Sequence, residues 1–178
     1  MPSSLSSNVS KANLSNPDIQ ELVITMTLEL QRGGRARLNY GTDVSDEHAA
    51  NTTKQLIPLL LENGGHVFLA YQGDACVGIM ICLNSISSYT LRLVLNVHDM
   101  YVREENRQQG HAKALLEAAR NWAKLQGYVR LSLEVQAKNT RAVKLYREFG
   151  FKGVPENRIM EDLAKTETKL YLELGLAS

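Results

Sequence analysis

The regular succession of strand-like and helix-like segments between Thr90 and Gly150 most constrains how this chain folds. Val129 to Val135 alternates strictly between apolar and polar residues, which is typical of a strand with one buried face. A strand-like run from Thr90 to Val102 comes before it, and helical patterns at 110–126 and 139–149 lie on either side. A glycine follows each of these two helical patterns, as is common at helix ends.

Helix and strand patterns also fill the first ninety residues. Asn16-Pro17-Asp18 predicts a helix start, because Asn caps helices, Pro suits the first position and an acid suits the first turn. We expect this helix to end at Gly33-Gly34. A second helix is expected from Ser45 to Asn63, kinked or shortened by Pro58. Three more strands are predicted, the first two joined as a hairpin by 72–74: His66–Tyr71, Cys76–Asn84 and Glu167–Leu174.

The resulting order, ααβββαβαβ, predicts an α/β (α+β) fold in which helices flank a mixed sheet. The chain has 178 residues, of which 44% are hydrophobic and 22% charged, and this suits one globular domain. Residues 1–16 are rich in Ser and Asn, so we expect a polar, flexible leader followed by a single domain at 17–178.

Charge and hydropathy speak against several classes of protein. A formal net charge of +1 gives no electrostatic case for nucleic acid or a membrane surface as a general partner. No apolar run approaches membrane-spanning length, and the first residues lack the pattern of a secretion signal. Cys76 and Cys82 lack metal-ligand spacing and read as buried, reduced residues. We therefore expect a cytoplasmic protein without a metal site.

The densest chemical signal is the hexapeptide Arg107-Gln108-Gln109-Gly110-His111-Ala112, which lies between a predicted strand and a predicted helix. Phosphate binding needs free backbone N–H groups at a helix start, and small residues that let an anion approach. Gly110 and Ala112 meet the second need, and Arg107 and Lys113 add cations. The alternative is a charged loop before a surface helix, since a short glycine motif is weak by itself.

Two blocks in this region resemble the GNAT acetyltransferases. The hexapeptide, preceded by Asp99 to Val102, is similar to the family's pyrophosphate loop, (Arg/Gln)-x-x-Gly-x-(Gly/Ala). The second block is similar to the family's second cofactor strand and the helix after it: Leu131–Val135, Asn139, Ala142, Tyr146 and Gly150-Phe151. The two blocks cover about a third of the chain in matching order, and they imply a GNAT-like, mostly antiparallel sheet.

The resemblance implies an acetyl-CoA site where the parallel strands Thr90–Val102 and Val129–Val135 splay apart. Its cofactor-binding positions fall on Met100, Tyr101 and Val102 for the pantetheine arm, and on Gln108, Gln109, Gly110, His111, Ala112 and Lys113 for the pyrophosphate. Arg107 either contacts phosphate or is a solvated charge. Asn139 either contacts the cofactor or only caps its helix. We expect the His111 ring to point to solvent, so that only its backbone takes part.

Acetyl transfer to an amine requires that the amine lose a proton and that the departing thiolate gain one. Tyr146 lies at the family's proton-donor position, although Leu145 and Phe149 indicate a core-facing helix in which a tyrosine is also structural. His98 is the first candidate base, because imidazole titrates near neutral pH. Glu134 is the second candidate and Asp99 the third, and a water chain is a further route for the proton.

The resemblance therefore implies an N-acetyltransferase that acts by direct attack in a ternary complex, on a small-molecule amine or a protein amino group. The alternative is a catalytically silent acyl-CoA-binding sensor. Segments 33–46 and 84–89 are the expected acceptor side. A homodimer through Tyr171–Leu174 is expected only by analogy.

Overall fold

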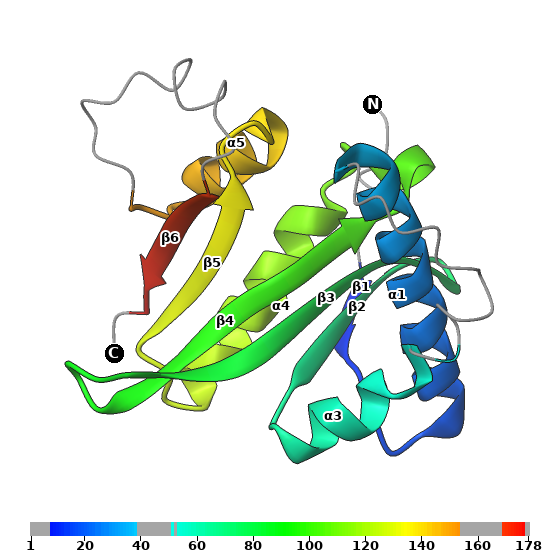
Figure 1. Ribbon diagram of the computed structural model, residues 1–178, viewed down its shortest axis with the longest axis horizontal. Coiled ribbons are helices and arrows are strands. Elements are labelled where there is room, and N and C mark those ends of the chain that lie inside the picture. The colour runs from blue at the N-terminus through cyan, green and yellow to red at the C-terminus, as the bar shows by residue number, and fades with distance from the viewer. Residues whose placement is uncertain (1–7, 39–50, 52, 154–168, 177–178) are drawn as a thin grey trace. The chain divides into compact units, whose positions relative to one another are not determined.

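The computed structural model describes residues 8–38, 51, 53–153 and 169–176. Its strands form one six-stranded sheet in the order β1-β2-β3-β4-β5-β6 (Figure 1). The elements follow in the order β1 (Asn8–Lys11), α1 (Pro17–Leu38), α3 (Leu56–Glu62), β2 (His66–Gln72), β3 (Ala75–Ser87), β4 (Arg92–Val102), η1 (Glu104–Asn106), α4 (His111–Leu125), β5 (Arg130–Gln136), α5 (Thr140–Phe149) and β6 (Lys169–Gly175).

The pairing confirms the predicted fold class. β1 with β2, β2 with β3, and β5 with β6 pair antiparallel, whereas β4 and β5 pair in parallel. The chain divides into two compact units, which we describe separately. The first comprises residues 1–83 and 99–118, and the second comprises residues 84–98 and 119–178.

In the first unit, α1 begins as predicted and ends later than predicted. The side chain of Asn16 accepts a hydrogen bond from the Asp18 N–H at 2.9 Å, which is an N-terminal cap. The helix continues through Gly33 to Leu38. Gly33 and Gly34 inside the helix cost about 1 kcal/mol each relative to alanine, which is too little to end a helix that is held by fully buried residues such as Val23 and Met26.

Helix α3 ends where the sequence predicts, with Asn63 at its C-cap. Its expected start near Ser45 lies outside the described residues. Pro58 is the third residue of α3, a position whose N–H has no intrahelical acceptor, so the regular helix tolerates it there.

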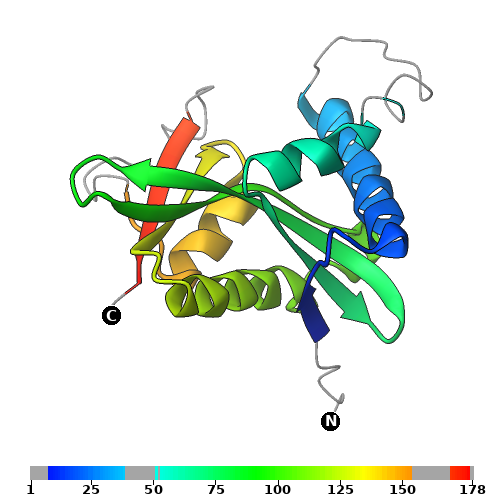
Figure 2. The ribbon, with the colours of Figure 1, turned by 90° about the horizontal axis from the view of Figure 1, so that it is seen from below.

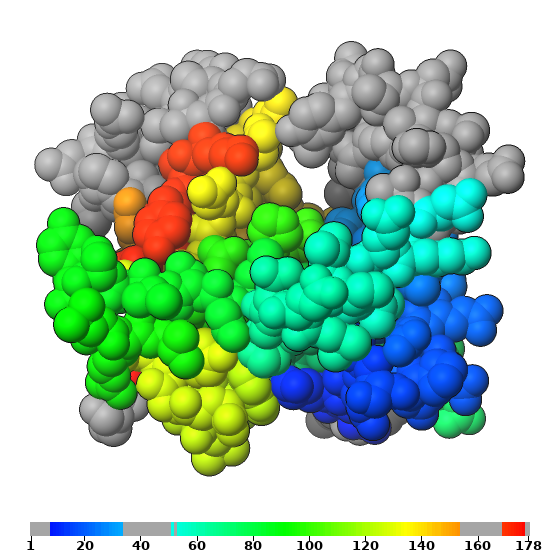
Figure 3. Space-filling view, turned by 60° about the horizontal axis from the view of Figure 1, so that its bottom comes forward, coloured from blue at the N-terminus to red at the C-terminus, as the bar shows by residue number. Residues whose placement is uncertain are grey.

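Helices α1 and α3 lie side by side against β2 and β3 (Figure 2). Their shared core gathers Val23, Met26, Ile57, Leu60, Val67, Leu69, Ile79 and Ile81. On the outer side of α3, which lies at the surface in Figure 3, Leu59 and Leu61 are exposed. Cys76 and Cys82 are buried free thiols, as predicted.

The sheet opens with a strand, β1, in a segment where the sequence predicts a flexible leader. β1 pairs with β2 from Asn8–Tyr71 to Lys11–Phe68, so part of the expected leader belongs to the fold. Most of its side chains are exposed, and its place in the sheet depends on backbone hydrogen bonds. A strand held in this way leaves no hydrophobic pattern to detect.

The second unit is built on β5, which pairs with β4 on one side and β6 on the other. The parallel ladder runs from Val94–Arg130 to Val97–Leu133, and the antiparallel ladder from Arg130–Gly175 to Gln136–Lys169. Helix α5 packs on β5 through Val143 and Tyr146. Among the helices that the structure describes, we find no apolar stretch of the length that crossing a bilayer requires.

Candidate functional site

The loop between β4 and α4 has an unusual backbone. Gln108 has φ 64° and Gly110 has φ 89°, so two residues within three adopt positive φ. Positive φ is unfavourable for a residue with a side chain such as Gln108. Alternation between right- and left-handed conformations lets successive N–H groups point to one side, which is a common arrangement for binding anions.

The start of α4 provides further donors. Its first helical hydrogen bond runs from the Ala114 N–H to the Gly110 carbonyl at 2.9 Å, and the N–H groups of the first turn have no intrahelical acceptor. The helix dipole adds about half a positive charge at this end. A Cβ placed on Gly110 would meet nothing within 4 Å, so a ligand can approach the backbone there. This loop fits a pyrophosphate group.

Arg107 folds back onto its own loop. Its Nε donates to the Val102 carbonyl at 3.0 Å, and its Nη1 lies 3.2 Å from a carboxylate oxygen of Glu104. Its side chain is 19% exposed, so the guanidinium is only partly solvated. In this arrangement Arg107 braces the turn that leads from β4 into η1.

The prediction that the His111 ring points to solvent is wrong. His111 is 2% exposed, and neither ring nitrogen has a hydrogen-bond partner among the described residues. The reason is helical spacing: His111 stands four residues before Leu115, which is fully buried on the inner face of α4. The spacing of Leu115 and Ala119 was the signal in the sequence that could have placed the histidine inside.

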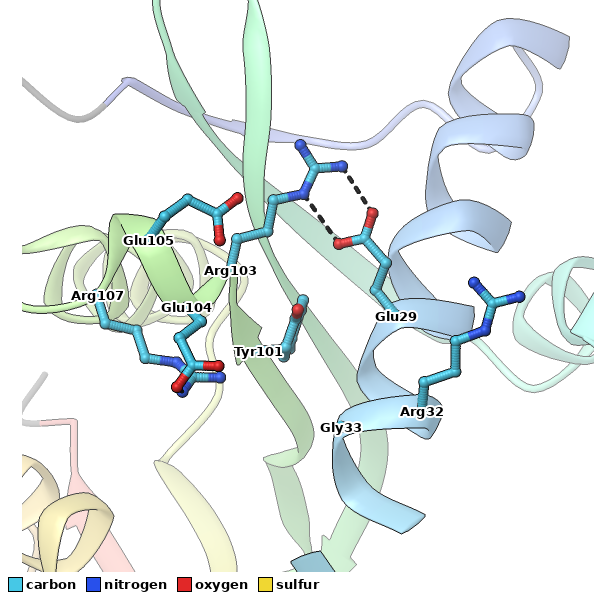
Figure 4. Close-up of a pocket in the computed structure, with 8 residues that line it drawn as sticks. All are labelled: Glu29, Arg32, Gly33, Tyr101, Arg103, Glu104, Glu105 and Arg107. Atoms are coloured by element: carbon cyan, nitrogen blue, oxygen red, sulfur yellow. Dashed lines mark hydrogen bonds and ion pairs between the residues drawn. The ribbon is translucent and has the colours of Figure 1, made fainter. Parts of the chain in front are cut away.

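A cavity of about 620 Å³ lies beside this loop in the first unit (Figure 4). Its lining comes from α1, the end of β4 and η1: Glu29, Arg32, Gly33, Tyr101, Arg103, Glu104, Glu105 and Arg107. Tyr101 and Arg107 are among the predicted cofactor residues. Burial, and then the nearby Glu29 carboxylate, raise the pKa of the Tyr101 hydroxyl above its ordinary value.

A two-pronged ion pair between Glu29 and Arg103, which no sequence motif marks, lies in the wall of this cavity (Figure 4). They stand 74 positions apart in the chain, and no local pattern joins them. Of the other predicted members of the loop, Gln108, Gln109 and Lys113 are exposed and Ala112 is half-buried.

The second unit holds the catalytic candidates Tyr146, His98 and Glu134, whereas Asp99 belongs to the first unit. Tyr146 is 8% exposed on the inner face of α5, and its ring meets Phe151 edge-on with 5.7 Å between centroids. His98 is exposed near the end of this unit's part of β4. Glu134 is exposed on β5 and forms an ion pair with Lys169 at 3.2 Å.

Asn139 caps α5, as one of its two predicted roles requires. Its side chain accepts a hydrogen bond from the Ala142 N–H at 3.3 Å. At the other end of α5, Gly150 adopts φ 107°. The polar residues of the parallel pair also meet, since the Asn96 Nδ2 donates to the Ser132 Oγ at 3.2 Å.

Comparison with known proteins agrees with this fold. Residues 35–151 match the Acetyltransferase (GNAT) family, which is more than half of the chain. The chain therefore belongs to the GNAT family of acetyltransferases.

Individual relatives resemble the chain only at low sequence identity. N-acetyltransferase 8B of Rattus norvegicus is 30% identical over 118 residues, which are 66% of this chain and 52% of that protein. The chain thus spans about half the length of this curated relative.

Two solved structures share the fold. The crystal structure of a probable acetyltransferase has a TM-score of 0.66 at 24% identity, covering 85% of this chain and 94% of that one. A putative acetyltransferase from Salmonella typhimurium, solved with its cofactor acetyl-CoA, has a TM-score of 0.64 at 13% identity, covering 96% of this chain and 94% of that one.

Proposed function

We propose that this chain moves an acetyl group from acetyl-CoA to an amine, by direct attack of the amine in a ternary complex. The observation that carries the proposal is the loop before α4, with positive φ at Gln108 and Gly110 and open space in front of Gly110. The Salmonella typhimurium structure with acetyl-CoA supports the choice of cofactor. The relative named N-acetyltransferase 8B supports nitrogen as the acceptor.

Within this proposal, the N–H groups from Gln108 to Lys113 hold the pyrophosphate, and the backbone of Met100 to Val102 holds the pantetheine arm beside the cavity at Tyr101. When bound, the cofactor supplies an activated thioester. The chain's own residues position it and move protons. Arg107 takes a supporting role, because its guanidinium is engaged by the Val102 carbonyl and Glu104.

An amine such as that of lysine has an ordinary pKa about three units above neutral pH, so a base must accept its proton before attack. We propose His98 in this role, with Glu134 as the second candidate and Asp99 as the third. Tyr146 is proposed to donate a proton to the departing thiolate.

The acceptor is proposed to be a small-molecule amine or a protein amino group. Most of the expected acceptor segment 33–46 lies outside the described residues. We retain the cytoplasm as the proposed location, for which the buried free thiols Cys76 and Cys82 are the supporting observation. A homodimer through β6 stays a prediction.

A matched pair of glycine variants tests the proposal. Gly110 and Gly127 flank α4 and both have positive φ, 89° and 78°, and a Cβ on either would meet nothing within 4 Å. Gly110→Val and Gly127→Val should each lose about 1–3 kcal/mol of stability from backbone strain. Only Gly110→Val should weaken CoA binding, by about tenfold or more, in a calorimetric titration.

Equal CoA affinity for the two variants would show that the loop does not hold the cofactor. Turnover is tested separately by thiol release from acetyl-CoA with a panel of amines. Tight CoA binding without acceleration by any amine would identify an acyl-CoA-binding module in place of an enzyme.

A further inference from the structure

Three amide side chains link the turn at the end of β2 to the loop before α4. The Asn106 Nδ2 donates to the Gln72 Oε1 at 2.5 Å, and the Gln72 Nε2 donates to the Gln109 Oε1 at 3.1 Å. The Gln109 Nε2 in turn donates to the Glu105 carbonyl at 3.0 Å. Gln72 thus contacts two residues of the loop that are 34 and 37 positions away in the chain.

The two contacts of Gln72 fall on either side of the strained residue in the loop. Gln108, at φ 64°, lies between Asn106 and Gln109. For a residue with a side chain, this conformation is unfavourable. It persists only where surrounding contacts hold it, and Gln72 holds the loop both before and after Gln108.

Gln72 is itself well placed to act as a fixed anchor. It is the last residue of β2, paired with Ala75 of β3 across the turn at Gly73. Its amide has one oxygen that accepts hydrogen bonds and two N–H groups that donate them. The loop uses the oxygen and one N–H group. The loop therefore takes its position from the β2–β3 hairpin as well as from its own strand and helix.

We propose that Gln72 is a positioning residue for cofactor binding, which holds the N–H groups around Gln108 in the geometry that receives the pyrophosphate. This inference rests on the proposed function of the loop. The two hydrogen bonds of Gln72 also contribute to the stability of the fold. Its effect on affinity should be confined to ligands that carry the pyrophosphate group, and this selectivity separates a positioning role from a loss of stability.

The test compares CoA with pantetheine, which lacks the pyrophosphate and the nucleotide. Gln72→Ala should weaken CoA binding about three- to tenfold and leave pantetheine binding within about twofold, because about 1 kcal/mol corresponds to a factor of about five. Gln126→Ala is the matched control, since Gln126 is an exposed glutamine at the other end of α4. It should change neither affinity.

A double-mutant cycle identifies the route. If Gln72 acts through the Gln109 side chain, Gln72→Ala combined with Gln109→Ala should weaken CoA binding less than the product of the single effects. Unchanged CoA affinity in Gln72→Ala, or an equal loss for pantetheine, would overturn the inference. If Gly110→Val also leaves CoA affinity unchanged, the proposed function of the loop fails as well. If Gly110→Val weakens binding and Gln72→Ala does not, only the role of Gln72 fails.

Discussion

Arg103 donates two hydrogen bonds to the Glu29 carboxylate, from Nε at 2.9 Å and from Nη2 at 2.7 Å. The pair ties the end of β4 to α1 and forms part of the cavity wall beside Tyr101. The side chains of Arg103 and Glu29 are 29% and 26% exposed, so water screens them only partly. The hydrogen bonding to Glu29 is the main reason why the pKa of Arg103 is raised.

Removing one partner of this pair should destabilise the fold. Glu29→Ala leaves a partly buried guanidinium without its carboxylate, and we expect a loss of about 1–3 kcal/mol in the free energy of unfolding. Urea denaturation measures it. Glu148→Ala is the control, because Glu148 makes an exposed pair with Lys144 at 3.8 Å whose removal should cost at most about 0.5 kcal/mol. Equal losses would show that the Arg103–Glu29 pair contributes no more than a surface pair.

Replacing His111 with leucine should stabilise the protein. The imidazole is buried without a hydrogen-bond partner among the described residues, and such a group costs about 1–3 kcal/mol. A leucine at this site removes that cost and extends the apolar face of α4, so the free energy of unfolding should rise by about 1 kcal/mol. Asn121→Leu, at an exposed position of the same helix, should change stability by at most about 0.5 kcal/mol. A less stable His111→Leu protein would mean that the imidazole makes a needed contact.

Tyr146→Phe should separate catalysis from cofactor binding. The change keeps the ring that packs edge-on against Phe151 and removes only the hydroxyl. A general acid typically contributes about a hundredfold to the rate, so kcat should fall by about that factor while CoA affinity stays within about twofold. Steady-state kinetics and a CoA titration measure the two effects. An unchanged kcat would leave Tyr146 with a packing role alone.

Stability should fall at alkaline pH because the thiols are buried. Burial raises the pKa of Cys82, and also that of Cys76, above the ordinary 9.0. Above about pH 9 the unfolded chain releases these protons while the folded protein keeps them, so the free energy of unfolding decreases as pH rises. Below that pH the thiols leave stability unchanged.

Urea denaturation between about pH 7 and about pH 10 tests this dependence. Cys82→Ala should show a shallower alkaline decline than the unmodified chain, even if its stability near neutral pH is lower. Parallel declines in the two proteins would exclude Cys82 as the source.

Most elements could be predicted because their signals are local. The cap at Asn16, the turn at Gly73 and the glycine after α5 each depend on residues within a few positions of one another. Strand β1 could not be predicted in this way, since it is held by backbone pairing to a partner about sixty residues away. The extension of α1 past Gly33 and Gly34 likewise depends on packing, which outweighs a propensity cost of about 1 kcal/mol for each glycine.

By itself, the sequence determined the GNAT class and located the proposed phosphate loop at Arg107 to Ala112, because such a loop needs particular small residues in a short stretch. Tertiary structure alone decided what holds that loop and what surrounds it. His111 turns inward, Arg107 bonds the Val102 carbonyl, and Gln72 reaches the loop from another strand. Gln72 and the loop are distant in the chain, and the inward position of His111 depends on which face of α4 is buried. Both are decided only when the chain has folded.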